Sequence, residues 1–162
     1  MLQRYTIYIV LPLLALLVGC NGSSSSRGAL HHDGAFTLYS LDGDRYPGEP
    51  APEGAELLHG WLVLKSCPIK SIATREKLFK ALDRGIDQYD AEFQVDCFNP
   101  RHAIRVESMG TTVDYLICFQ CSNYYIWEGE KQVSGGNTTS YPKATFDEVL
   151  AGCSGKTTTD DN

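Results

Sequence analysis

The stretch from residue 97 to residue 127 constrains the fold most, because it holds two runs of β-branched and aromatic residues joined at Met109-Gly110. Such runs around a glycine-containing turn indicate a β-hairpin. In the register that this turn sets, Arg105 lies opposite Asp114. One face of the hairpin is mostly apolar and is expected to face the core: His102, Ile104, Val106, Val113, Tyr115, Ile117 and Phe119. The other face carries Arg101, Ala103, Arg105, Asp114, Leu116 and Cys118.

Residues 1–19 have the layout of a signal peptide. Arg4 supplies a positive charge, and the apolar run that follows is short for a permanent membrane helix. The run ends at Leu17-Val18-Gly19-Cys20, which resembles the lipobox of bacterial lipoproteins. The resemblance implies cleavage before Cys20 and acylation of that cysteine, with chains such as palmitate that hold the protein on a membrane. The alternative is an ordinary secretory peptide in which the cysteine is incidental.

The residue after Cys20 and the overall charge bear on location and partners. Asn21 stands where some inner-membrane lipoproteins carry a retaining aspartate, so the outer membrane is favoured over the inner. Residues 20–35, rich in serine and glycine, are predicted to be a tether with a reach on the order of 20 Å. The chain has 14 basic and 20 acidic side chains and a net charge of −6. This balance argues against nucleic acid and leaves the membrane, an envelope protein or a small ligand as partners.

Residues 36–153 are predicted to form a single α+β domain, and residues 154–162 a disordered tail. Strands are expected at residues 36–41 and 57–64, in the hairpin, around the aromatic run 124–127 and, as a short strand, at 138–141. Ser71 can cap a long amphipathic helix. A capping box from Thr145 to Glu148 predicts a second, short helix. The predicted fold is an antiparallel sheet of four or five strands with one long and one short helix packed on one face.

Several segments of this domain are similar to an uncharacterised family of small bacterial proteins. The resemblance is carried by Leu38-Tyr39-Ser40-Leu41-Asp42, His59-Gly60-Trp61, Cys97-Phe98-Asn99-Pro100-Arg101-His102-Ala103-Ile104-Arg105, Asp114-Tyr115-Leu116-Ile117-Cys118-Phe119-Gln120-Cys121 and Phe146-Asp147-Glu148-Val149-Leu150. It implies a shared fold and no particular activity. Cys67 and Cys153 lie outside the shared pattern, which suggests that they pair with each other.

Five of the six cysteines remain after acylation of Cys20, an odd number for an oxidising compartment. In a structural interpretation, Cys97 pairs with Cys121 or Cys118 across the hairpin, and Cys67 pairs with Cys153. In a metal interpretation, thiolates and an imidazole form a zinc site from Cys97, His102, Cys118 and Cys121. In a redox interpretation, Cys118 and Cys121 are a reactive pair near Arg101. The metal interpretation is disfavoured because residues three apart in a strand point to opposite faces. The redox interpretation is disfavoured because a strand, rather than the N-terminus of a helix, is expected after Cys121.

The charged residues of the hairpin suggest a further site. Arg101 and Arg105, with Asp114 holding Arg105 and His59 nearby, could bind an anionic ligand. The simpler interpretation is a cross-strand ion pair on a solvated face. The aromatic residues Tyr124, Tyr125 and Trp127 could likewise dock a sugar or a partner, or belong to the core.

These observations predict a membrane-anchored envelope lipoprotein that acts as a non-enzymatic binding or interaction module without a cofactor. A periplasmic zinc-binding protein is the alternative, and a thiol-disulfide oxidoreductase is the third hypothesis. No serine, histidine and carboxylate set and no phosphate-binding glycine loop stands out in the sequence.

Overall fold

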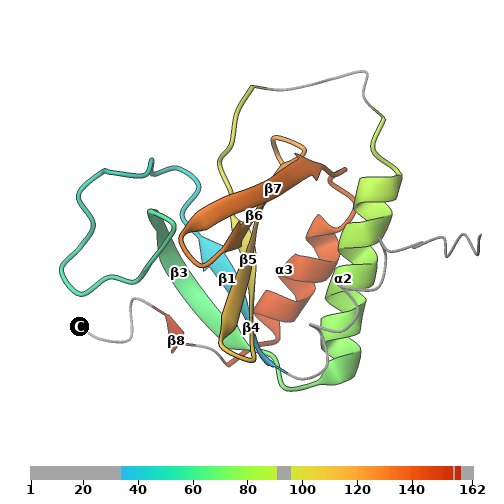
Figure 1. Ribbon diagram of the computed structural model, residues 1–162, viewed down its shortest axis with the longest axis horizontal. Helices are drawn as coiled ribbons and strands as arrows, with labels where there is room; N and C mark the ends of the chain where they lie inside the picture. The colour runs from blue at the N-terminus through green and yellow to red at the C-terminus, as the bar shows by residue number, and fades with distance from the viewer. Residues whose placement is uncertain (1–33, 91–95, 155, 158–162) are drawn as a thin grey trace, which may run out of the picture.

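The computed structural model describes residues 34–90, 96–154 and 156–157. The predicted signal peptide, Cys20, the tether and most of the predicted tail lie outside these residues. The described part is an α+β domain in which one curled antiparallel sheet carries two helices (Figure 1).

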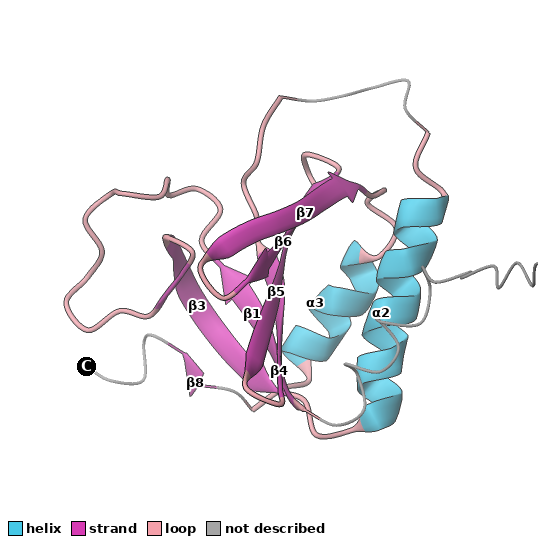
Figure 2. Cartoon of the chain, viewed as in Figure 1, coloured by secondary structure: helices cyan, strands magenta, loops and turns pink. Residues whose placement is uncertain are grey.

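The prediction of four or five strands is wrong, because the sheet has more. Its strands follow the order β2-β3-β1-β4-β5-β6-β7, curled into a half-barrel, and β8 pairs with β3 off this path (Figure 2). The strands are β1 (Ala35–Leu41), β2 (Leu57–Leu58), β3 (Trp61–Pro68), β4 (His102–Ser108), β5 (Thr111–Cys118), β6 (Asn123–Glu128), β7 (Lys131–Asn137) and β8 (Lys156–Thr157).

Two local features account for β2 and β7, and the remaining additional strand, β8, lies within the predicted tail. His59 and Gly60 both have positive φ angles, so the predicted strand at 57–64 is split by a tight turn into β2 and β3. β7 forms at a glycine pair that disfavours a strand by propensity. The packing against β6 requires a glycine at this position, because the Cβ atom of any other residue at 135 would lie 2.5 Å from the Tyr125 ring. Residues 138–141, predicted as a short strand, form a loop instead.

The central hairpin has the predicted register. β4 and β5 pair Arg105 with Asp114 and Ile104 with Tyr115, as expected from the turn at Met109-Gly110. The apolar face of this hairpin packs against both helices in the main core, with Ile104 and Ile117 fully buried.

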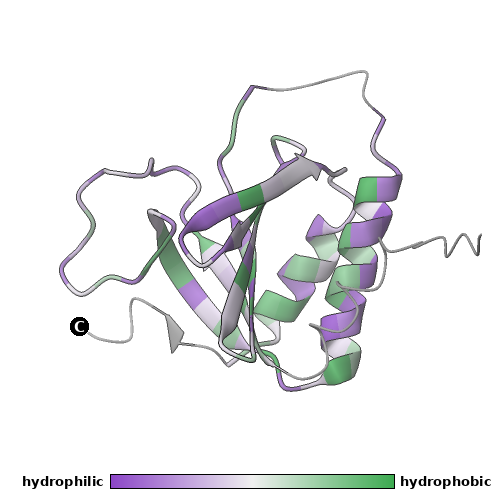
Figure 3. Ribbon diagram, viewed as in Figure 1, coloured by the Kyte–Doolittle hydropathy of each residue, from purple (hydrophilic) through white to green (hydrophobic). Residues whose placement is uncertain are grey.

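The long helix α2 (Ile72–Asp87) begins as predicted, with the Ser71 side chain accepting a hydrogen bond from the Thr74 amide at 3.3 Å. The short helix α3 (Lys143–Ala151) begins two residues before Thr145, after Pro142, and has no side-chain cap. The predicted capping box is therefore wrong, and Glu148 instead forms an ion pair with Lys77 of α2 at 2.8 Å. Hydrophobic and hydrophilic patches alternate along both helices, as amphipathic packing requires (Figure 3).

The opposite face of the sheet carries a second apolar cluster. Its buried members are Tyr39, Leu41, Leu58, Trp61, Val63, Ala103 and Leu116, with Phe98 and Trp127 packed against them. The hairpin face that carries Arg105 and Asp114 is therefore covered rather than solvated, because the β2–β3 turn and β6 approach each other across it.

Candidate functional site

A charged cluster lies within the second apolar face of the sheet. Arg105 donates from Nε and Nη2 to the two carboxylate oxygens of Asp114, at 2.8 and 2.7 Å. His59 reaches the same carboxylate from the β2–β3 turn, with Nε2 2.7 Å from Oδ2. Asp114 is only 1% exposed, so one buried carboxylate joins β4, β5 and the β2–β3 turn. The sequence predicted the Arg105–Asp114 pair, whereas the position of His59 depends on its left-handed turn.

Burial and mutual hydrogen bonds determine the electrostatics of this cluster. The hydrogen bond with Asp114 raises the pKa of Arg105, although burial acts in the opposite direction. Burial raises the pKa of Tyr39, and the nearby Arg105 only partly offsets that rise. Asp114 already accepts three hydrogen bonds, and protonation of its carboxylate during base catalysis would disrupt its contacts with Arg105 and His59. The arrangement therefore holds the strands together more readily than it performs acid–base chemistry.

The predicted anion site is not assembled. Arg101 lies at the entrance to β4 and pairs with the exposed Asp44, with 2.5 Å between Nη2 and Oδ1. Arg105 is occupied by Asp114, so each guanidinium has its own carboxylate. The structure does not bring the two arginines together around one vacant position.

The aromatic residues of β6 are engaged with other rings. Tyr125 contacts Phe98 with 4.3 Å between ring centroids, and Trp127 stacks on His59 at 4.2 Å. Tyr124 is buried in the main core. This favours the core interpretation of the aromatic run.

A second polar contact, which sequence reasoning missed, lies on the helix-facing side of the sheet. His102 Nε2 is 2.9 Å from Asp147 Oδ1 of α3, and Lys143 donates to the other oxygen of Asp147. Burial lowers the pKa of His102, and the hydrogen bond with Asp147 only partly restores it. Burial acts to raise the pKa of Asp147, but its hydrogen bonds with Lys143 and His102 outweigh this and lower it.

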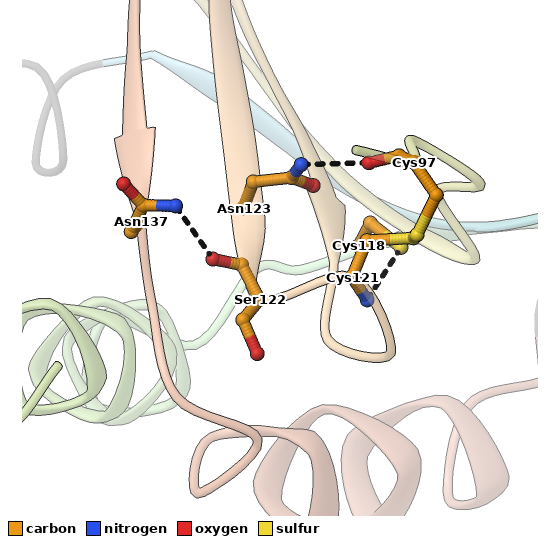
Figure 4. The surroundings of a disulfide bond; sticks show 6 residues. All are labelled: Cys97, Cys118, Cys121, Ser122, Asn123 and Asn137. Atoms are coloured by element: carbon orange, nitrogen blue, oxygen red, sulfur yellow. Dashed lines mark hydrogen bonds between the residues drawn. A yellow bond between two sulfur atoms is a disulfide. The ribbon is translucent and has the colours of Figure 1, made fainter. Parts of the chain in front are cut away.

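The expectation of disulfide bonds is confirmed. The structure joins Cys67 to Cys153 and Cys97 to Cys121. Cys118 is a free, buried thiol, and its sulfur accepts a hydrogen bond from the Cys121 amide at 3.1 Å (Figure 4). β5 ends at Cys118 and residues 119–122 form a turn. The premise that Cys118 and Cys121 lie three apart within one strand is therefore wrong.

The four residues of the zinc hypothesis do not converge. Cys97 and Cys121 are consumed by their disulfide, and His102 lies on the helix-facing side, away from Cys118. Within residues 34–90, 96–154 and 156–157, no group of three or more histidine, cysteine or acidic side chains is arranged to hold a metal ion.

An open groove of about 430 Å³ lies on the outer surface between α2 and α3. Lys77, Lys80 and Arg84 line it along one ridge of α2, together with Tyr141. Arg84 donates from Nη1 to the Tyr141 hydroxyl at 2.7 Å and lies over its ring. The spacing of three and four residues between Lys77, Lys80 and Arg84 places them on one face of a helix, and this spacing could have indicated the ridge from the sequence. The other lining residues are Ala73, Glu76, Ala81 and Thr145.

No family model, curated protein or solved structure matches this chain. In the part of the chain that the structure describes, no helix has the length and apolar character needed to cross a membrane.

Proposed function

We propose that this chain is a lipid-anchored protein of the bacterial envelope whose α+β domain binds a partner without catalysing a reaction. The two disulfides carry the proposal, because disulfides form and persist in oxidising compartments outside the cytosol. The lipobox ending at Cys20 provides the route to such a compartment and the anchor. Export and oxidation are thus supported by independent parts of the chain.

The groove between α2 and α3 is the proposed binding surface. Three cations line it, although Lys77 and Lys80 already pair with Glu148 and Glu76. These are exposed pairs, which contribute little to stability and can exchange partners at small cost. An acidic segment of an envelope protein is the partner that this groove fits, and Tyr141, 49% exposed, adds an aromatic contact.

Fatty-acid labelling tests the anchor. Cells that express the full chain are grown with an alkyne-tagged fatty acid, and the protein is analysed for label and membrane association. We expect label on the native chain and none on Cys20→Ser. Cys118→Ser serves as the matched control, because it makes the same substitution at a cysteine outside both disulfides and should remain labelled. Label that persists on Cys20→Ser would reject the lipoprotein assignment.

Site-specific photo-crosslinking tests the binding surface. A photoreactive residue at Lys80 should give a defined adduct in the envelope, whereas one at the exposed Lys131 of β7 should not. Reversal of charge by Lys77→Glu together with Arg84→Glu should abolish the Lys80 adduct, and added salt should weaken it. Equal adducts at Lys80 and Lys131, or insensitivity to the reversal, would reject the groove as the binding surface.

A further inference from the structure

We infer that Cys97, Cys118 and Cys121 form a thiol–disulfide exchange site that takes a disulfide-bearing partner. Cys118 displaces Cys97 from Cys121, and the released Cys97 thiol then forms a mixed disulfide with the partner. This inference depends on neither the lipid anchor nor the groove between the helices.

The three cysteines differ sharply in exposure. Cys97 is exposed, whereas Cys121 and Cys118 are each only 1% exposed. The disulfide thus joins a surface residue to a buried one, and the third sulfur is on the buried side. A nucleophile already inside the protein can reach the buried sulfur of Cys121, while solvent reaches only Cys97.

Cys118 is held against the backbone of the residue whose sulfur it must attack. The Cys121 amide donates to Cys118 Sγ at 3.1 Å, within the turn that follows β5. Residues three apart across a turn have Cα atoms within roughly 7 Å of each other, and Cα atoms of bridged cysteines are about 4.4–6.8 Å apart. A bond between Cys118 and Cys121 therefore needs side-chain rotation and little backbone movement.

Cys97 approaches Cys121 from a different segment of the chain. It precedes β4, whereas Cys118 ends β5 and Cys121 lies in the turn between β5 and β6 (Figure 4). Asn123 Nδ2 donates to the Cys97 carbonyl oxygen at 2.8 Å. This bond does not involve sulfur, so it can keep Cys97 beside the turn after its disulfide has opened. The exchange is therefore expected to be reversible.

The first step is balanced within the protein. The Cys118 sulfur attacks Sγ of Cys121 and forms the Cys118–Cys121 bond. The Cys121–Cys97 bond breaks, its electron pair leaves on the Cys97 sulfur, and that sulfur takes up the proton that Cys118 gives up. One disulfide is broken and one is formed, so no oxidant or reductant is consumed.

The second step joins the partner. The Cys97 thiolate attacks one sulfur of the partner's disulfide, and the other sulfur leaves as a thiolate. One disulfide is again exchanged for another. The product is a mixed disulfide at Cys97 with Cys118 and Cys121 bridged behind it.

Trapping with N-ethylmaleimide tests the first step. The full-length protein in detergent is alkylated at mildly alkaline pH without reductant, and its peptides are mapped by mass spectrometry. We expect the label on Cys97 and a linked Cys118–Cys121 peptide, with Cys67–Cys153 intact as the internal reference. Alkylation that requires denaturation and then falls only on Cys118 would overturn the inference.

Variants separate exchange from simple reduction. Cys118→Ser should fold with Cys97–Cys121 intact and lose the native labelling of Cys97. Cys97→Ser, isolated from the envelope, should contain the Cys118–Cys121 disulfide. Two free thiols in Cys97→Ser would show that the turn does not allow that bond and would refute the exchange.

A small disulfide probes the second step. Native protein mixed with dipyridyl disulfide should release one equivalent of the coloured thione and carry a pyridylthio group on Cys97 as a mixed disulfide, whereas Cys118→Ser should release none. Equal release from both proteins would place the reactive sulfur outside the proposed exchange site.

Discussion

Asp114 holds the charged cluster of the sheet together, because its buried carboxylate accepts hydrogen bonds from both Arg105 and His59. Asp114→Asn keeps the shape of the side chain but leaves the partly buried guanidinium without a counter-charge. Breaking a buried pair in this way costs about 3–5 kcal/mol, and the partial exposure of Arg105 places the expected loss near the lower end. Urea unfolding followed by tryptophan fluorescence measures it, with Trp61 and Trp127 flanking the cluster.

Asp44→Asn is the matched control for that substitution. It breaks the exposed pair with Arg101 by the same chemical change and should cost less than about 1 kcal/mol. If the two variants lose equal stability, the buried cluster does not brace the sheet as described.

His102 makes stability depend on pH. Because burial lowers its pKa in the folded protein, the unfolded chain binds this proton more readily than the folded domain does. Its contribution is complete above the ordinary histidine value of about 6.5 and is lost as pH falls below that value toward the lower folded pKa. Unfolding free energies measured from pH 7 to pH 5 should fall less steeply in His102→Gln than in the native protein. A double variant of His31 and His32, in the predicted tether, should keep the native slope, and an unchanged slope in His102→Gln would contradict the assignment.

At the scale of elements, the sequence predicted those whose signals are local. The hairpin register follows from one turn at Met109-Gly110, and α2 follows from Ser71 and an apolar stripe. β7 and the start of α3 were missed because they depend on neighbours, including the Tyr125 ring beside Gly135. The same distinction holds for the contacts of the candidate site. The Arg105–Asp114 pair could be predicted because it follows from the register of the hairpin. The contacts of His59 with Asp114 and of Asp147 with His102 join segments far apart in the sequence, so only the folded chain shows them.

Gly85 shows how packing can override helix propensity within α2. Alanine is favoured over glycine in a helix by about 1 kcal/mol. At this position, however, a Cβ atom would lie 2.5 Å from both Pro142 Cγ and Thr138 Oγ1. The Gly85 carbonyl also accepts a hydrogen bond from the Thr139 amide, so the connection to α3 has little freedom to move away. We expect Gly85→Ala to destabilise the domain by roughly 1 kcal/mol net, because overpacking costs more than propensity returns.

Thermal unfolding followed by circular dichroism checks this expectation. Ala73→Gly, at an exposed position of the same helix, reports propensity alone and should lose up to about 1 kcal/mol. Opposite exchanges at the two positions should therefore both destabilise the domain. A stabilised Gly85→Ala variant would show that the α2–α3 connection relaxes freely.

At the scale of the whole molecule, the two disulfides constrain very different lengths of chain. Cys67–Cys153 closes a separation of 86 residues and Cys97–Cys121 one of 24. In the chain-entropy model, these correspond to about 4.6 and about 3.5 kcal/mol of stabilisation. Cys67–Cys153 also ties β3 to the segment after α3, across the helix-facing core, where Cys67 is fully buried.

Replacing both members of each pair by alanine should therefore destabilise the domain unequally, by about 1 kcal/mol more for Cys67 and Cys153 than for Cys97 and Cys121. Each pair contains one buried sulfur, that of Cys67 or of Cys121, so the small cavity left by its removal adds to both losses and leaves the difference to the lengths of the closed loops. Cys118→Ala removes a sulfur without removing a cross-link and isolates the packing contribution. Urea unfolding of the three variants under non-reducing conditions measures the differences. If the Cys97 and Cys121 variant loses as much stability as the other or more, the shorter bridge stabilises the fold through native contacts around the β5–β6 turn rather than through restriction of the unfolded chain.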